Sequence, residues 1–217
     1  METGSNGSVT HRGNAKGDRS RQEITRIAID CFAKYGFQGT SVDRIARMAG
    51  VTKGAIYYHF RDKEDLLIAT VADRISAFET VVQHACEDLA PDRALARIAE
   101  INIEQARSND QARFVITLMV EAIDTNAGVS AQLRDMMRRF RGFIRDMITE
   151  GQRLGVFVPE ADAQAVASTY TSTILGAQIQ FYQDPERFRF DEAITAWLSP
   201  LLSSLVVEPP RADASRN

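Results

Sequence analysis

The chain has 217 residues, 44% of them hydrophobic and 25% charged, which is the composition of a soluble protein with a substantial core. Its apolar runs, such as Phe114 to Val120, are too short to cross a bilayer, and its polar first residues are unlike a signal peptide. The net charge of −3 is uneven: ten Lys and Arg against six Asp and Glu precede residue 63, and sixteen against twenty-three follow it. A basic front on an acidic body favours an anionic partner for the front only.

Residues 1–19 are rich in Gly, Ser and Asn, and we expect them to form a disordered arm. Helical periodicity then begins at a capping box formed by Ser20 and Glu23, and Gly36 is a natural stop. Apolar positions recur between these limits at i, i+3, i+4 and i+7, which predicts one buried helix face made of Ile24, Ile27, Ala28, Cys31, Phe32 and Tyr35.

A short second helix is expected from Thr40, where a second capping box begins, to the break at Gly50. Thr52 can cap a third helix, whose inward residues are Ile56 and Phe60. Both helices are too short to be stable alone, so they must pack on the first one. Because Gly50 permits a sharp turn between them, this segment predicts a helix-turn-helix.

A fourth helix is expected from Asp62. Helix then follows helix, over residues 92–107, 110–125, 129–154, 161–183 and 188–206, with turn or breaker residues between them. No stretch alternates convincingly as a strand does. The sequence therefore predicts an all-α chain with four parts: the arm 1–19, a helix-turn-helix domain 20–66, a larger helical domain 67–207 and a flexible tail 208–217.

The third helix is of a size that fits the major groove of B-DNA, and its outer face carries suitable groups. Gly54 and Ala55 are small enough for close approach to base edges, and Lys53 can reach a guanine or a phosphate. Exposed aromatic residues on a short helix also occur at protein interfaces, and this alternative stays open. The predicted DNA contacts are Thr40, Ser41, Arg44, Thr52, Lys53, Gly54, Ala55, Tyr57, Tyr58, His59 and Lys63.

The stretch GTSVDRIARMAGVTKGAIYYHFRDKEDLL, residues 39–67, resembles the signature of the TetR family of bacterial transcriptional regulators. The resemblance covers about residues 20–70 and implies about nine helices, of which the first three bind DNA and the others form a ligand-binding and dimerisation domain. It also implies a homodimer that binds a palindromic DNA operator and is released by a small-molecule inducer. Repression is the family's commoner mode, and an activator or a co-repressed regulator of the same fold is the alternative.

The resemblance further implies that the last two helices, roughly 161–183 and 188–206, form a four-helix bundle with those of a second copy. Small residues at near-helical spacing in the first of them suit close packing across a two-fold axis. The predicted dimer interface comprises Ala165, Thr169, Ser172, Gly176, Ala177, Trp197 and Leu201.

A ligand pocket is expected among the fourth to seventh helices, and its ligand is expected to be largely apolar. Methionines in this region could form an adaptable apolar site, although ordinary core packing is the alternative for each residue. The basic segment from Met137 to Arg145 could bind an acidic head group, or its arginines could pair with the acidic body. The candidate ligand contacts are Phe78, Asn102, Phe114, Leu118, Met119, Glu121 and Met137.

Two other classes of function, an enzyme and a DNA-binding protein without a sensor, have less support in the sequence. An enzyme lacks support, because the chain has no HExxH, CxxC, Walker A or GxSxG motif. The separation of Cys31 and Cys86 indicates neither a disulfide nor a metal site, and His84 is more readily a solvated residue than a ligand. A DNA-binding protein without a sensor would not need about 140 further residues of helix. We expect no cofactor, no metal, no membrane partner and a cytoplasmic location.

Overall fold

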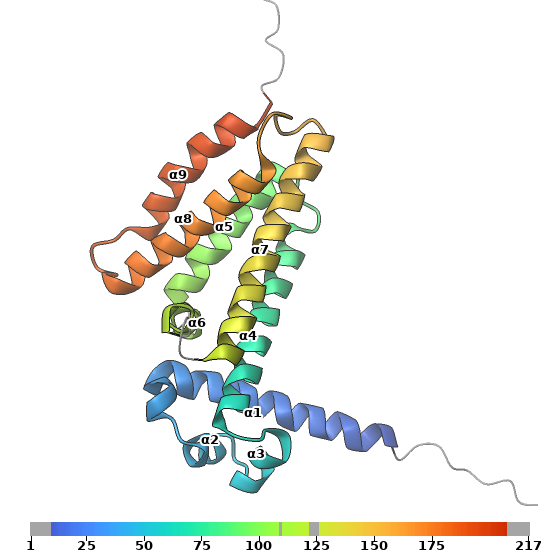
Figure 1. Ribbon diagram of the computed structural model, residues 1–217, viewed down its shortest axis with the longest axis vertical. Coiled ribbons are helices and arrows are strands. Elements are labelled where there is room, and N and C mark those ends of the chain that lie inside the picture. Colours follow the sequence, from blue (N-terminus) through green and yellow to red (C-terminus); the bar gives the residue numbers. More distant parts are fainter. Residues whose placement is uncertain (1–9, 109, 122–125, 208–217) are drawn as a thin grey trace, which may run out of the picture.

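The computed structural model describes residues 10–108, 110–121 and 126–207, and over these ranges the chain forms nine helices, so the expected all-α class is confirmed. Figure 1 shows α1 to α3 at one end of the molecule, here called the head, and a bundle of α4 to α9, here called the body. The helices are α1 (Thr10–Gly39), α2 (Val42–Met48), α3 (Lys53–His59), α4 (Lys63–Cys86), α5 (Pro91–Ser108), α6 (Asp110–Glu121), α7 (Ala127–Arg153), α8 (Ala163–Gln183) and α9 (Phe190–Leu205).

α1 begins at Thr10, so the second half of the arm that was expected to be disordered is helical. Ser20 is therefore an interior residue of the helix. The capping signal at Ser20 fails because a helix that already runs through this position leaves no free N–H groups to cap. Gly36, with φ 70° and ψ 169°, breaks the helical path inside the assigned range, as the sequence predicted. Residues 1–9 of the expected arm lie outside the described residues.

The caps and the turn of the helix-turn-helix are formed by hydrogen bonds between residues close together in sequence. Ser41 is the N-cap of α2, one residue later than expected, and Thr52 is the N-cap of α3. α2 ends in a Schellman motif, in which the Val51 N–H donates to Ala46 O and the Gly50 N–H donates to Arg47 O. Gly50 adopts φ +65°, a left-handed conformation that only glycine and a few polar residues take easily.

Replacing Gly50 with valine is expected to lower the free energy of unfolding by about 1–2 kcal/mol, the cost of a left-handed conformation for a residue with a Cβ. A Cβ added there meets no atom of the described chain within 4 Å, so steric clash does not contribute. Chemical denaturation measures the change. Gly50→Asn is the matched control, because asparagine tolerates this conformation, and equal losses in the two variants would contradict the explanation.

Most helices of the body run roughly along its length, with α6 lying across them, and α4 rises from the head beside α7 (Figure 1). α8 begins after Asp162, whose carboxylate accepts hydrogen bonds from the N–H groups of Gln164 and Ala165. No helix in the described ranges is long and apolar enough to cross a membrane. α6 ends at Glu121, while 122–125 of the expected helix and the expected tail 208–217 lie outside the described residues.

The hydrophobic core consists of two clusters, and their division does not follow the boundary expected at residue 66. The upper cluster lies among α4, α5, α7, α8 and α9. The lower cluster fills the head, but it also includes residues of α4, α6 and α7, so head and body share one core. The body residues in it are Leu66, Leu67, Val71, Ile75, Phe114, Val115, Leu118, Val129 and Leu133.

The connection between α7 and α8 is tied to the end of α9. Gly151 lies against the ring of buried Phe157, leaving no room for a Cβ. The Gln152 amide donates to the carbonyl oxygens of Val158 and Ala161. An isolated antiparallel bridge then pairs Phe157 with Val206. These contacts fix the α7–α8 connection, and α8 with it, against the rest of the body.

Candidate nucleic-acid interface and ligand pocket

The outer face of α3 is open to solvent. Ile56 is fully buried in the head core, which fixes the rotation of the helix. The side chains of Tyr57 and Tyr58 are 47% and 84% exposed as a result. Large aromatic side chains are usually more buried than this, so these two are available to a partner. Of the remaining predicted contacts on this helix, Thr52, Lys53 and Gly54 are exposed, and Ala55 and His59 are half-buried.

A hydroxyl group caps the N-terminus of each of the short helices α2 and α3. The Ser41 hydroxyl accepts from the Arg44 N–H at 3.2 Å, and the Thr52 hydroxyl accepts from the Ala55 N–H at 3.1 Å. Each hydroxyl still has its own proton to donate to a phosphate oxygen. Arg44 donates to Gly39 O and covers the ring of Tyr35, with 4.2 Å between guanidinium carbon and ring centroid.

Thr40 occupies a different environment from the one expected. Its side chain is buried, with 1% exposure, and its hydroxyl lies 2.8 Å from Gly36 O and 3.0 Å from Cys31 O. The hydroxyl thus satisfies carbonyl groups at the end of α1 and is turned away from any groove-facing surface. The error arose because Ser41, and not Thr40, is the residue that caps α2.

Two of the lysines expected at the interface already have partners within the head. Lys53 forms an ion pair with Asp43 at 2.9 Å, which raises its pKa through the hydrogen bond to that carboxylate. Lys63 donates to Phe37 O at 2.8 Å and to Thr40 O at 3.1 Å, and it lies over the Phe37 ring. An ammonium group has three donors, so Lys63 keeps one for a phosphate while it holds α1 to the start of α4.

Lys63→Ala is expected to have two effects. It removes a cation close to the groove-facing surface, so the slope of log K against log salt concentration should fall by about one unit, with similar losses on all sequences. It also leaves two carbonyl groups without their donor, so the head should melt earlier. Filter binding at several salt concentrations and thermal denaturation measure the two effects. Arg138→Ala, in the body, is the control, and an unchanged slope would remove Lys63 from the DNA contacts.

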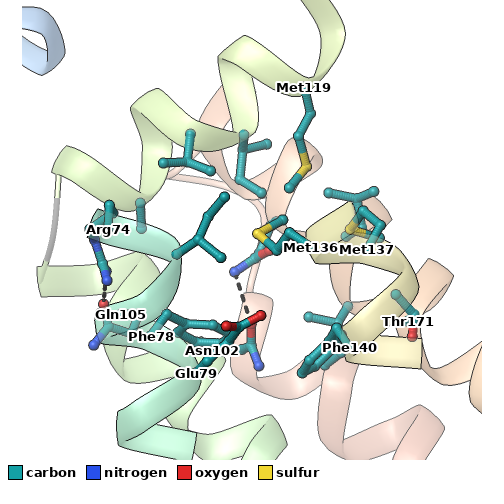
Figure 2. A pocket seen from close by; sticks show the side chains of 17 residues that line it. Arg74, Phe78, Glu79, Asn102, Gln105, Met119, Met136, Met137, Phe140 and Thr171 are labelled. Atoms are coloured by element: carbon teal, nitrogen blue, oxygen red, sulfur yellow. Dashed lines mark hydrogen bonds between the residues drawn. The ribbon is translucent and has the colours of Figure 1, made fainter. Parts of the chain in front are cut away.

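A pocket lies inside the body between α4, α5, α6, α7 and α8, with about 770 Å³ of space that is partly open to solvent. Its wall is mainly apolar and includes three methionines, Met119, Met136 and Met137, that surround one part of the space (Figure 2). A mainly apolar wall with a few polar groups suits a small organic molecule, and flexible methionine side chains allow the pocket to adapt.

The structure separates the residues that were predicted to contact a ligand. Four of them line the pocket, on four different helices: Phe78, Asn102, Met119 and Met137. Phe114 and Leu118 face the other way and belong to the lower core, where Phe114 stacks on Phe32 of the head. Glu121 is exposed and is not part of the pocket wall.

Polar groups in the pocket are arranged in pairs. Asn102 donates to Ile98 O and accepts from the Gln178 amide at 3.4 Å, and both residues are buried. Glu79 pairs with Arg139 at 2.8 Å. Arg74 donates to the Gln105 side-chain oxygen. Sequence reasoning missed four polar residues of the wall, Arg74, Glu79, Gln105 and Gln178. A long polar side chain next to apolar positions, such as Arg74 beside Ile75 in α4, is a signal that could have found some of them.

The arginines of the basic segment in α7 pair with carboxylates of the body. Arg138 lies 3.1 Å from Asp135, Arg139 contacts Glu79, and Arg145 lies 2.6 Å from Asp146. Of the two interpretations of this segment, the structure therefore favours a solvated face with local ion pairs.

The pocket is connected to the head through α4 and α6. α4 contributes Leu66 to the head core, Arg74 to the pocket about two turns later, and Phe78 about one turn after that. α6 lines the pocket with Met119 and packs Phe114 on Phe32 of α1, with 6.1 Å between ring centroids. A ligand that shifts either helix therefore also shifts the surface on which α1 rests.

Most of the residues expected at the dimer interface lie on one face of α8 or on α9. Ala165, Thr169 and Ser172 are exposed, and Gly176 is half-buried with open space where a Cβ would point. Trp197 and Leu201 of α9 are half-buried. Ala177 is the exception: it is buried in the upper core, because one residue after Gly176 the helix has turned by about 100°.

His84 and Cys86, two residues apart in α4, lie in different environments. Cys86 is buried in the upper core, whereas His84 is exposed and lies 3.6 Å from Glu87. Within the described ranges, no group of three or more His, Cys, Asp or Glu side chains could hold a metal ion.

Family models match both parts of the chain. The model for "Bacterial regulatory proteins, tetR family" matches residues 24–70, which include the helix-turn-helix. The model for "BetI-type transcriptional repressor, C-terminal" matches residues 91–206, which make up more than half of the chain. The two matches together include the helix-turn-helix, the expected dimer face and the part of the pocket wall contributed by α5 to α8, while the α4 part of that wall lies between them.

Three known proteins illustrate the similarity. The HTH-type transcriptional regulator SrpR of Pseudomonas putida is 26% identical over 167 residues, which is 75% of each chain. The transcriptional regulator FadR from Bacillus subtilis, solved in complex with stearoyl-CoA, superposes with a TM-score of 0.70 at 19% identity, covering 84% of this chain and 98% of FadR. A putative transcriptional regulator from Saccharomonospora viridis, solved in complex with choline, superposes with a TM-score of 0.76 at 21% identity. The match covers 88% of this chain and 100% of that regulator.

Proposed function

The chain belongs to the TetR family of bacterial transcriptional regulators, with a BetI-type C-terminal part, and from this we propose that it is a homodimeric repressor whose operator is released by a small molecule in the body pocket. Its relatives are DNA-binding transcriptional regulators, so the chain is a regulator and not an enzyme. We expect it to act in the cytoplasm, where its DNA partner is found.

The observation that carries the proposal is the shared core of head and body. Leu118 of α6 is buried in the lower core, while Met119, the next residue along the helix, lines the pocket. A well-packed core transmits small displacements, because its side chains cannot move independently. The pocket and the DNA-binding surface are thus two ends of one packed unit, which is the arrangement a ligand-controlled repressor needs.

DNA binding by a dimer requires a fixed distance between its two α3 helices. They must enter successive major grooves, about 34–36 Å apart along the operator. We propose that the dimer forms through the exposed small residues of α8, which allow close approach, together with the half-buried apolar side chains of Trp197 and Leu201 of α9.

The ligand acts by selecting one separation of the heads. A molecule that binds more tightly when α4 and α6 are displaced lowers the population of the DNA-binding state, and the shift cannot exceed the difference in affinity between the two states. The apolar wall of the pocket supports a largely apolar ligand. The ligands in the two solved neighbours, stearoyl-CoA and choline, differ in charge and size, so the neighbours do not identify it.

Selection of duplexes from a random DNA pool by the purified protein, at two salt concentrations, tests the proposal. We expect an enriched inverted repeat whose half-sites are one helical turn apart, and a dimer by analytical ultracentrifugation. A monomer, or a dimer that enriches no symmetric sequence at either salt concentration, would contradict the proposed operator recognition. The enriched duplex then serves as the probe for release by ligands.

A further inference from the structure

Arg74 is the polar residue that stands out in the pocket. It lies near the middle of α4, beside Ile75 and one turn before Phe78, on the helix that connects the pocket with the head. Figure 2 shows Arg74 and Gln105 together on one side of the pocket, with Met136 and Met137 away from them on the other. The pocket thus has a polar end with a guanidinium group and an apolar remainder.

The guanidinium of Arg74 is incompletely satisfied. Of its five N–H donors, one is given to the Gln105 side-chain oxygen, and the buried Nε has no hydrogen-bond partner in the described chain. Across residues 10–108, 110–121 and 126–207, no carboxylate lies within ion-pair distance of it. Burial lowers the pKa of Arg74, but a guanidinium remains charged at neutral pH.

The other charge in the pocket wall does not compensate for Arg74. Glu79 lies one and a half turns further along α4 and is already paired with Arg139. The buried hydroxyl of Tyr182 also lacks a partner, and it is close enough to interact with the charge of Arg74. Tyr182 is not part of the pocket wall, so the polar end of the pocket has the positive charge of Arg74 and one unpaired donor, the Arg74 Nε–H. Arg74 is half-buried, with an unpaired Nε–H and no ion-pair partner in the described ranges, so an anion bound here would complete its hydrogen bonds and balance its charge.

We propose that the ligand of this pocket is an amphipathic organic acid, with its carboxylate bound by Arg74 and its apolar part among Met119, Met136 and Phe140. A carboxylate matches the planar fork of a guanidinium in size and geometry. A phosphate ester dianion fits less well, because a single arginine would leave its second charge unpaired. The proposal rests on the function proposed above, in which this pocket is the site of the releasing ligand.

Probes with one alkyl chain and different head groups separate the possibilities. Decanoate, decyl phosphate, decan-1-ol and decyltrimethylammonium are titrated into the full-length protein below their critical micelle concentrations, with binding measured by calorimetry. We expect decanoate to bind at least tenfold more tightly than the alcohol and the cation, and more tightly than the phosphate. The same titrations are followed by release of a fluorescent operator duplex.

Variants of Arg74 test the role of the guanidinium itself. Arg74→Met keeps an unbranched side chain and removes the charge, so decanoate should lose about tenfold or more in affinity while decan-1-ol binds as before. Arg74→Lys keeps the charge but not the planar pair of donors, so its affinity for decanoate should lie between those of the wild type and Arg74→Met. If Arg74→Met does not fold, Arg74→Lys takes its place in the test. Arg138→Met, an exposed arginine of α7, is the matched control and should bind decanoate like the wild type.

The outcomes distinguish the two proposals. Four results would overturn the organic-acid assignment. These are equal binding of decanoate and decan-1-ol, tighter binding of the phosphate or the cation than of decanoate, no binding of any probe, and full decanoate affinity in the Arg74 variants. Release of the operator by the alcohol or the cation would then leave the proposed regulation intact. Conversely, decanoate binding that requires Arg74 but never releases the operator would support the assignment and contradict the proposed regulation.

Discussion

Replacing Gly54 with phenylalanine is expected to abolish specific operator binding while the protein remains folded. Gly54 lies in the first turn of α3, exposed on the outer face, and a Cβ there meets only the Thr52 hydroxyl oxygen at 3.8 Å. A large side chain therefore fits the free protein. In a complex it would occupy the space between helix and base edges, and specific affinity should fall by roughly 100-fold or more, towards the non-specific level.

Fluorescence anisotropy with the selected operator measures this loss, and circular dichroism verifies the fold. Gly54→Ala is the matched control: one methyl group is small, and alanine is the better helix former by about 1 kcal/mol, so this variant should be at least as stable. Wild-type affinity in the phenylalanine variant would show that α3 does not enter the groove with this face.

Phe32→Ala is expected to be the most destabilising of the substitutions considered. The Phe32 ring is fully buried and lies between Phe37 of the head and Phe114 of α6, with centroid distances of 5.8 Å and 6.1 Å. Removing such a ring leaves a cavity, and the free energy of unfolding should fall by about 3–5 kcal/mol. In a chain of this length, the melting temperature should fall by roughly 10 °C.

Thermal and urea denaturation measure the effect of Phe32→Ala. Tyr58→Ala is the control, because that ring is 84% exposed and its removal should change stability by less than about 0.5 kcal/mol. The same control is expected to weaken DNA binding, so the two variants separate folding from recognition. A loss below about 1 kcal/mol in Phe32→Ala would mean that head and body do not depend on this contact.

The head could be predicted almost entirely from sequence because its signals are local. Caps, the glycine turn and the rotation of α3 each depend on residues within one turn of the chain, and Ile56 alone fixes which side chains point outward. The failures there have the same origin. Ser20 and Thr40 both resemble helix caps in the sequence. Ser20, however, lies inside a continuous helix, and Ser41, not Thr40, caps α2.

The pocket was only half predictable because it is made by contacts between helices. Periodicity places Phe114 and Met119 on the same helix but does not tell which of them faces the head and which the pocket. The same applies to Ala177, which differs from its exposed neighbours by its rotation about α8. Arg74 was missed because its surroundings are contributed by α5 and α8, at positions far away in sequence.

The core shared by head and body also bears on the exchange of parts between related regulators. Grafting the first 66 residues onto another body would leave Phe32 and the other head residues against foreign α6 and α7 surfaces. A functional chimera would have to carry Phe114, Leu118, Val129 and Leu133 along with the head, or match their shapes. In this chain the transferable module is therefore a three-dimensional unit with segments from both halves of the sequence, and a single cut after α3 does not isolate it.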